Sequence, residues 1–425
     1  MKLGIPKLVH FVFAVLVTFV LTAAGQASKA KQIDDLITPL AKGEHFSGVV
    51  VASENGKVIY EKAFGFANAD FRIPNALNTR IGIASITKPM TIVILSRLIE
   101  ENKIKLSDPL TKYVPDFPNG EKITIEMIRQ HRSGILHRVM PPEMESLPYT
   151  SAEMVDKVKQ AKLAFEPGSR RLYSSGGFAV LARVLEIASG RTYVELLQQY
   201  VFGPAGMKDS LDFNGEAIME RRAQDYILSE LGYRNAALKD YSFLVGAGSV
   251  FSTAADTHRF GMAVVDGKYG EAAKASLISE GLFSASGSTN GHRAYVEVKA
   301  DRSYGYAILS NLACGSVDIV RAGVREIMEG KEPTVKKLAV PKFDTSANRD
   351  LDQFLGKYKA ADGSEIEIVK RNGSLHSADI RLYSVKPDCF FDYRFFGEAC
   401  FIRDAGRIKE IKWKGVGFEL AWTKQ

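Results

Sequence analysis

Residues 81–90 read IGIASITKPM and lead directly into an apolar segment. On a helix, Ser85 and Lys88 share one face, so the lysine amine can reach the serine hydroxyl. A serine is a poor nucleophile until a nearby base takes its proton, and a lysine shielded from water can have a pKa low enough to help. The S-x-x-K spacing thus predicts Ser85 as a nucleophile and Lys88 as its partner. The alternative is a serine that only caps the helix, followed by an exposed lysine.

Four further motifs follow Ser85 in order. They are residues 131–134 (HRSG), 165–169 (FEPGS), 173–175 (YSS) and 246–256 (GAGSVFSTAAD). In this order and at these spacings they resemble the serine β-lactamase-like family, which includes class C β-lactamases, D-alanyl-D-alanine carboxypeptidases, D-aminopeptidases and esterases. The resemblance runs from about Phe46 to about Met328. It implies a helical region packed on an antiparallel sheet, and acyl transfer through the serine.

The resemblance gives Tyr173 and Ser175 roles. Tyr173 matches the tyrosine of the family's Y-x-N or Y-x-S motif. A phenol whose pKa is lowered by two nearby ammonium groups can act as a base, whereas the alternative is an ordinary core tyrosine. Ser175 holds the third position of the motif, where many relatives carry asparagine. We expect it to contact the substrate through this shorter side chain.

A further family motif, which lies on a strand of the sheet in relatives, is only partly present in this chain. Relatives carry Lys-Thr-Gly or His-x-Gly at the strand where this chain has Ala285, Ser286 and Gly287. Ser286 and Gly287 fit the pattern, and the backbone N–H of the following Ser288 would pair with that of Ser85 as an oxyanion hole. Ala285 stands where the cation usually is, so the sequence favours neutral esters over substrates that present a carboxylate.

Histidines and one arginine offer less specific signals. His292 and Arg293 lie close enough in sequence to replace the missing cation, and they are equally well explained as solvated loop residues. His131 and Ser133 are predicted to be structural, because the family has this motif at a helix-to-loop junction away from the nucleophile. No role is predicted for the remaining histidines that we considered, which are His45, His137, His258 and His376.

The composition of the chain excludes some classes of binding partner. The chain has 425 residues, 46% of them hydrophobic and 25% charged, with a net charge of +7. This charge is spread along the sequence without a basic cluster interleaved with aromatics, so we expect no nucleic-acid partner. No spacing of cysteine and histidine resembles a zinc site, and the chemistry expected of Ser85 needs no metal or cofactor.

The N-terminus predicts export. Residues 1–27 show the charged, apolar and small-residue order of a secretory signal peptide, and the alternative is a membrane anchor. The apolar run is shorter than the roughly 20 residues that a span needs, which favours cleavage and a periplasmic or secreted protein. An oxidising compartment permits disulfides. Cys389 and Cys400 lie in a strand-rich stretch and can face each other across a hairpin, unless they remain buried thiols.

The expected organisation is α+β with a second domain. We expect a serine hydrolase domain over residues 28–330, a polar linker over 331–349 and a small antiparallel β-barrel over 350–425, which resembles the lipocalin-like C-terminal domain of some family members. Helices are predicted at Ile33 to Ala41, Met90 to Glu101, Ile125 to Gln130, Ala152 to Ala161 and Phe178 to Ala188. Strands are predicted at Ser47 to Ala52, Lys57 to Tyr60, Ala294 to Val298 and Tyr306 to Leu309, and in the barrel at Ile366 to Val369, Ser374 to Ile380, Cys389 to Tyr393, Ala399 to Arg403, Ile408 to Trp413 and Phe418 to Trp422.

These observations converge on one function and one alternative. We expect an exported serine hydrolase that acts through an acyl-enzyme on an ester or amide. An esterase or D-amino-acid peptidase is favoured, with weak β-lactamase activity. The alternative is a catalytically weak, penicillin-binding-like protein that binds peptidoglycan fragments or a partner. Ala285 favours this alternative, and intact Ser85, Lys88 and Tyr173 argue against it.

Overall fold

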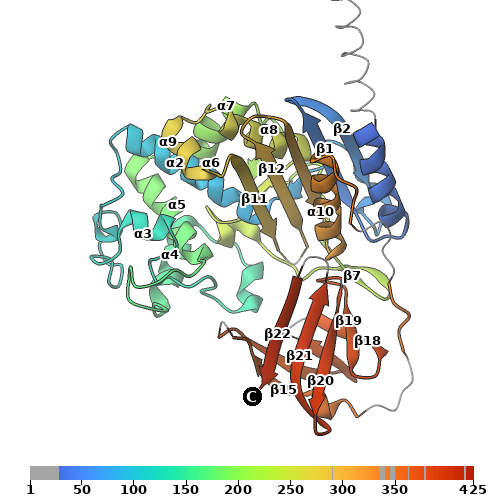
Figure 1. Cartoon of the computed structure of the whole chain (residues 1–425). Helices are drawn as coiled ribbons and strands as arrows, with labels where there is room; N and C mark the ends of the chain where they lie inside the picture. Colours follow the sequence, from blue (N-terminus) through green and yellow to red (C-terminus); the bar gives the residue numbers. More distant parts are fainter. Residues whose placement is uncertain are drawn as a thin grey trace, which may run out of the picture.

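The computed structural model describes residues 28–289, 291–334, 340–344, 350–361, 363–377, 380–415 and 418–425. The expected leader, residues 1–27, and part of the expected linker lie outside these residues. Figure 1 shows a larger body of mixed helices and strands and, below it, a barrel formed by the C-terminal segment. The predicted α+β class with a C-terminal antiparallel barrel is confirmed.

The larger body is built on a six-stranded antiparallel sheet in the order β10-β11-β12-β13-β1-β2. Its strands are β1 Gly48–Glu54, β2 Lys57–Phe64, β10 Ile278–Ser279, β11 Leu282–Ser288, β12 Arg293–Lys299 and β13 Tyr304–Ser310. Strands from the two ends of this body meet where Gly48 pairs with Ser310. Along β1, Val49 packs into the core on one face of the sheet and Val50 into the core on the other. Because both faces are covered, β1 reads as a continuous apolar run.

Helices cover both faces of this sheet (Figure 1). A helix over residues 28–42 and α10 Ser316–Met328 pack on one face through Ile33, Ile37 and Val320. On the other face lie α2 Thr87–Glu100 and α8 Ala254–Val265. The remaining α-helices are α3 Ile125–Arg129, α4 Ser151–Gln160, α5 Ser175–Ser189, α6 Tyr193–Leu197, α7 Gly203–Ala205 and α9 Glu271–Leu277.

Shorter elements connect these layers. The short strands are β3 Phe66–Asn68, β4 Ile73–Pro74, β5 Ile81–Gly82, β6 Leu211–Asp212, β7 Tyr226–Ser229, β8 Gly232–Asn235, β9 Val250–Ser252 and β14 Leu312–Ala313. The 3₁₀ turns are η1 Ala84–Ile86, η2 Leu110–Lys112, η3 Pro142–Ser146, η5 Tyr241–Leu244 and η6 Asp352–Phe354, and η4 Gln198–Phe202 is a π-helical segment. Each of the five predicted helices is present within a few residues of its expected bounds.

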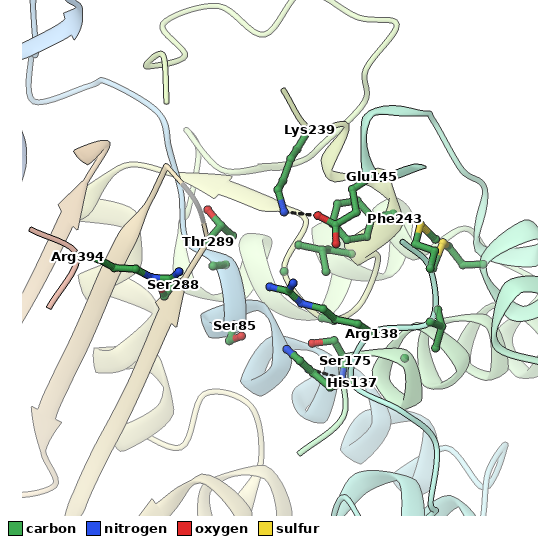
Figure 2. Close-up of a pocket in the computed structure, with 18 residues that line it drawn as sticks. Ser85, His137, Arg138, Glu145, Ser175, Lys239, Phe243, Ser288, Thr289 and Arg394 are labelled. Atoms are coloured by element: carbon green, nitrogen blue, oxygen red, sulfur yellow. Dashed lines mark hydrogen bonds and ion pairs between the residues drawn. The ribbon is translucent and has the colours of Figure 1, made fainter. Parts of the chain in front are cut away.

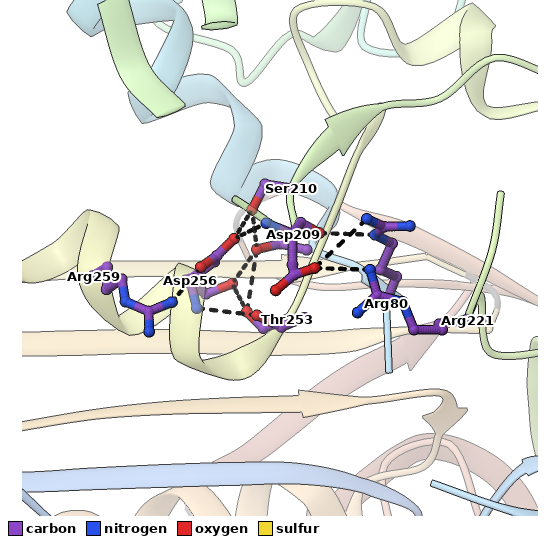
Figure 3. A network of polar contacts seen from close by, with 9 residues as sticks. Arg80, Asp209, Ser210, Arg221, Thr253, Asp256 and Arg259 are labelled. Carbon is purple, nitrogen blue, oxygen red and sulfur yellow. Dashed lines mark hydrogen bonds and ion pairs between the residues drawn. The ribbon is translucent and has the colours of Figure 1, made fainter. Parts of the chain in front are cut away.

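The GAGSVFSTAAD motif at residues 246–256 is partly structural. Asp256 is fully buried at the start of α8, where it accepts hydrogen bonds from the Asp209 N–H at 2.7 Å and the Ser210 hydroxyl at 2.9 Å (Figure 3). Its own N–H donates to the Thr253 hydroxyl, which caps the helix. These bonds tie the start of α8 to the segment before β6. Strand β6 pairs with β9, which also pairs with β5, the strand that precedes the turn carrying Ser85.

The C-terminal segment forms a closed eight-stranded barrel. Its strands are β15 Gly356–Lys359, β16 Glu365–Arg371, β17 Ser374–Ser377, β18 Ile380–Lys386, β19 Cys389–Asp392, β20 Gly397–Asp404, β21 Arg407–Gly415 and β22 Phe418–Lys424. The predicted single run from Ser374 to Ile380 is wrong, because it contains all of β17 and the first residue of β18, which pair with each other antiparallel. The predicted disulfide is confirmed: Cys389 and Cys400 pair in register across β19 and β20 and are bonded.

The barrel packs against the larger body through its β19–β20 turn. Phe391, Tyr393 and Phe396 share a hydrophobic cluster with Leu312 and Cys314. Gly315 lies so close to the turn that a Cβ added there would be 2.3 Å from the Phe395 carbonyl carbon. The two bodies are therefore in contact at a position where a side chain would not fit. Among the described helices, none combines the length and apolar character needed to cross a membrane.

Candidate active site

Ser85 lies at a sharp change of chain direction between β5 and α2. The preceding Ala84 has a φ of 47°, a left-handed conformation that costs free energy for a residue with a Cβ and that is often found at functional sites. Ser85 belongs to the short η1 turn and is partly exposed, whereas Ala84 and Ile86 on either side are buried. The local backbone thus presents one hydroxyl to a cavity at the start of a helix.

Lys88 lies one turn further along, and its amine contacts three neutral acceptors. Nζ donates to Ser85 Oγ at 3.2 Å, to Ser175 Oγ at 3.1 Å and to the Ala247 carbonyl at 2.9 Å. Only 5% of the residue is exposed. Burial lowers the pKa of the Lys88 amine to about 7, because the charged form loses its hydration. Close to neutral pH, a large share of this lysine is therefore uncharged and able to accept a proton.

Tyr173 lies beside this amine, with Lys88 Nζ 4.8 Å from the centre of its ring. The His131 ring packs against the tyrosine, with the ring centres 4.7 Å apart. Burial raises the pKa of the Tyr173 phenol, and the neighbouring Ser85 hydroxyl opposes this with a smaller effect. The expectation that ammonium groups lower this pKa is therefore wrong, because desolvation is the larger effect. Tyr173 keeps its proton at neutral pH and can donate it.

Ser174 and Ser175 begin α5 at the base of the cavity. Ser174 caps the helix by accepting the Gly177 N–H at 2.8 Å, and its own N–H donates to His131 Nδ1 at 3.1 Å. This hydrogen bond gives His131 a structural role, but the expectation that its motif lies away from the nucleophile is wrong, because the His131 ring packs against Tyr173 in the site. The Ser175 N–H donates to His137 Nδ1 at 3.2 Å, and His137 lines the cavity. Sequence reasoning missed His137, although it follows the HRSG motif closely.

Strand β11 forms the facing wall. A Cβ added at Gly287 would lie 2.8 Å from the Ser85 nitrogen and 2.1 Å from the Ile83 carbonyl oxygen, so only glycine allows this approach. Ser288, the next residue, lines the cavity. Ser286 is exposed but is not among the residues that line the cavity. Ala285 is partly buried and packs against the hydrophobic core.

The two residues suggested as replacement cations do not reach the cavity. His292 is fully buried, and its Nε2 lies 2.7 Å from Asp225 Oδ1. Arg293 donates from Nη2 to the Arg394 carbonyl oxygen at 3.1 Å. Neither side chain is among those that line the cavity, so neither substitutes for the cation that Ala285 lacks.

The cavity between these walls has a volume of about 120 Å³. Figure 2 shows Ser85 on its floor, Arg138 and His137 on one side, and Arg394 reaching in beside Ser288. Three lining side chains are cationic, namely Arg138, Lys239 and Arg394, and one is a carboxylate, Glu145. Lys239 and Glu145 form a buried ion pair with each other. The pocket is therefore cationic overall despite Ala285, which the sequence did not predict.

Among the described residues, the histidine, cysteine and carboxylate side chains close enough to share an ion are Cys389, Glu398 and Cys400. This group lies in the barrel, and its two sulfurs are joined in the disulfide. Those sulfurs are therefore not available as thiolate ligands.

Comparison with known proteins gives the family. The sequence model of the β-lactamase family matches residues 33–322, about two thirds of the chain. The chain belongs to the β-lactamase family. Its class is that of a serine hydrolase, and the resemblance drawn from the motifs around Ser85 is confirmed.

Relatives of this β-lactamase family member differ in their named activities. Penicillin-binding protein 4* of Bacillus subtilis is 27% identical over 59% of this chain and 60% of its own length. Teichoic acid D-alanine hydrolase of Staphylococcus aureus is 26% identical over 55% of this chain and 59% of its own. The chain thus spans about three fifths of these two curated relatives. The D-amino acid amidase of Ochrobactrum anthropi has the same fold, with a TM-score of 0.63, 20% identity, and coverage of 71% of this chain and 99% of that one.

Proposed function

We propose that the protein is an exported acyl hydrolase that cleaves esters or amides of D-amino acids through an acyl-enzyme on Ser85. The observation that carries this proposal is the buried Lys88 amine, 3.2 Å from the Ser85 hydroxyl and with a pKa of about 7. Two of the similar proteins are named for D-amino-acid substrates, which supports the substrate class. The leader pattern at residues 1–27 and the disulfide in the barrel support export.

The proposed reaction starts with proton removal from Ser85. Neutral Lys88 accepts the hydroxyl proton while Oγ forms a bond to the substrate carbonyl carbon. The carbonyl oxygen becomes an oxyanion, which accepts hydrogen bonds from the backbone N–H groups of Ser85 and Ser288. When the bond to the leaving group breaks, the leaving group takes a proton from Tyr173 or from protonated Lys88. Water then attacks the ester on Ser85 and releases the acid.

Efficient β-lactamase activity is not part of this proposal. In many members of the family, an asparagine is expected at the position of Ser175. Here the Ser175 hydroxyl is buried and accepts a hydrogen bond from Lys88 at 3.1 Å. It therefore holds the lysine and has a shorter reach toward the amide side chain of a penicillin. We expect β-lactams to acylate Ser85, and we expect the resulting acyl-enzyme to be hydrolysed slowly.

Steady-state kinetics with matched substrates test this function. We expect kcat/KM for D-alanine p-nitroanilide to exceed that for its L enantiomer by at least about 10-fold, a typical cost of a misplaced reacting group. Benzylpenicillin should give a burst of about one equivalent followed by slower turnover than the D-anilide. Steady-state hydrolysis of benzylpenicillin faster than that of the D-anilide would contradict the proposal. Binding of penicillin without any acylation would favour the penicillin-binding-like alternative.

The pH dependence follows from Lys88. If the neutral amine is the base, kcat/KM rises with pH as the free enzyme loses this proton, with an apparent pKa of about 7. The sign follows from burial, which disfavours the protonated amine and so moves the pKa down from the usual 10.5. The measurement is a kcat/KM profile from pH 5 to 10 on the D-anilide. If kcat/KM instead keeps rising toward pH 10 without reaching a plateau, Lys88 titrates like an ordinary, solvated lysine and the prediction is wrong.

A further inference from the structure

A second cavity lies between the barrel and the larger body. It has a volume of about 220 Å³, whereas the cavity at Ser85 has about 120 Å³. Its wall is mostly apolar, and both bodies contribute to it through Ile227, Leu228, Ala237, Ile380, Tyr383 and Tyr393. Ligand sites often lie at such domain boundaries and have mostly apolar walls. An apolar cavity of about 150 Å³ is known to hold benzene, so this cavity is large enough for an aromatic ring on a short chain.

The charged side chains in this wall favour an apolar ligand over an anion. Arg381 donates to Glu230 at 2.7 Å, and the buried Asp392 carboxylate accepts the Arg394 N–H at 2.6 Å. Arg234 is exposed, so its charge is well hydrated. An anion would have to compete with Glu230 or with water for these groups. An apolar group, by contrast, gains free energy by leaving water for the apolar part of the wall.

Two residues line this cavity as well as the one at Ser85. They are Thr289, which follows β11, and Arg394 in the β19–β20 turn, and Figure 2 shows both on the same side of Ser85. The Thr289 N–H donates to the His292 carbonyl at 3.0 Å, and Arg293 Nη2 donates to the Arg394 carbonyl at 3.1 Å. The two cavities are therefore neighbours, and hydrogen bonds hold the backbone at their boundary. A preorganised wall loses little conformational freedom when a ligand binds.

The place of this boundary along the sheet indicates which part of a substrate lies beside the second cavity. Strand β11 passes Ser85 at Gly287. In the family motif a cation is expected at the position of Ala285, before this glycine, and penicillins and D-alanyl-D-alanine peptides carry their carboxylate on the leaving group. The leaving group is therefore expected toward residue 285. Thr289 lies on the other side of the glycine, so the acyl group points to the second cavity.

We propose that the cavity between the barrel and the larger body binds an aromatic or other apolar group attached to the α-nitrogen of the D-amino acyl substrate. This inference rests on the proposed function and names its substrate class, N-acylated D-amino acids. The charge of the first cavity supports this class, because Arg138, Lys239 and Arg394 outnumber the single carboxylate of Glu145. A free α-ammonium group is repelled by such a cavity, whereas an N-acyl group is neutral.

The test compares N-(4-phenylbutanoyl)-D-alanine p-nitroanilide with N-acetyl-D-alanine p-nitroanilide. In the wild type, we expect kcat/KM to favour the phenylbutanoyl substrate by about 10- to 100-fold, a typical gain from burying an aromatic group. Ala237→Trp fills the second cavity without changing a residue that lines the first, so it should remove this preference and keep the kinetics of the acetyl substrate. The matched control is Leu238→Trp at the next position, which is 81% exposed and lines neither cavity. It should keep the preference.

A second variant tests the same cavity from the barrel, because the new indole at the exposed Ala237 can also turn toward solvent. Ile380→Asp places a carboxylate in the apolar wall and should lower the preference. Its matched control, Ile402→Asp, changes an exposed barrel residue outside both cavities and should have no effect. A preference that is unchanged in both Ala237→Trp and Ile380→Asp would overturn the inference. So would a wild type that favours N-succinyl-D-alanine p-nitroanilide, whose terminal carboxylate would show that the cavity takes an anion.

A binding measurement separates this inference from the proposed function. In the Ser85→Ala protein, titration calorimetry with N-(4-phenylbutanoyl)-D-alanine amide and N-acetyl-D-alanine amide needs no turnover. We expect the phenylbutanoyl amide to bind about 10- to 100-fold more tightly, and the added Ala237→Trp change to remove this advantage. If the wild type hydrolyses neither anilide but this binding difference persists, the proposed function fails and the inference about the second cavity stands. Equal binding of the two amides would contradict the inference.

Discussion

Lys88→Met is expected to lower kcat/KM for the D-anilide by about 10⁴-fold, the upper range for removing a general base. Methionine has a similar length and no charge, so it fits a position that is 5% exposed without burying an ammonium group. The Ala247 carbonyl loses its donor, which costs about 1–3 kcal/mol at most. The protein should therefore stay folded while losing activity, and kinetics together with a thermal melt check both expectations.

Two controls separate a base from a mere positive charge at residue 88. Lys88→Arg keeps the charge, but a guanidinium does not give up its proton near neutral pH, so this variant should also be inactive. Lys57→Met removes a lysine that is exposed on β2 and should retain wild-type kinetics. Activity within about 10-fold of the wild type in Lys88→Met would contradict the role of Lys88 as the base.

Local sequence signals predicted the elements that carry this chemistry. The S-x-x-K spacing placed Ser85 and Lys88 on one turn, and the structure brings their side chains to 3.2 Å. Apolar runs predicted α2, which is buried around most of its surface, and β1, whose two faces pack into separate cores. The cysteine pair in the barrel was predictable because a hairpin brings residues of adjacent strands into register.

The rest of the site depends on contacts between distant segments. Arg394 enters the cavity from a barrel turn, and Lys239 reaches it as part of an ion pair with Glu145, so no local pattern marks either residue. The direction in which the pKa of Tyr173 shifts could not be predicted from its motif, because it depends on burial by distant segments, which raises the pKa and outweighs the opposing effect of the Ser85 hydroxyl. His292 resembled a free loop cation in the sequence, and only the fold places it against Asp225.

Ser85→Ala is expected to have the largest effect, a loss of about 10⁶-fold in kcat, as seen when a serine nucleophile is removed. Ser175 is the nearest competing nucleophile, since Lys88 donates to both hydroxyls at similar distances. The two hydroxyls differ in exposure: Ser175 is buried at the start of α5, whereas Ser85 is partly exposed to the cavity. Ser175→Ala should therefore retain measurable turnover, with a lowered rate because Lys88 loses one acceptor.

Covalent labelling of the intact protein tests whether Ser85 is the nucleophile. The protein is treated with a fluorophosphonate, digested with trypsin, and the adduct is located by fragmentation within the peptide spanning residues 81–97. We predict one adduct per chain, on Ser85, and no adduct on this peptide in Ser85→Ala. An adduct on Ser175 or Ser96, labelling that persists unchanged in Ser85→Ala, or no labelling of the wild type would contradict the account.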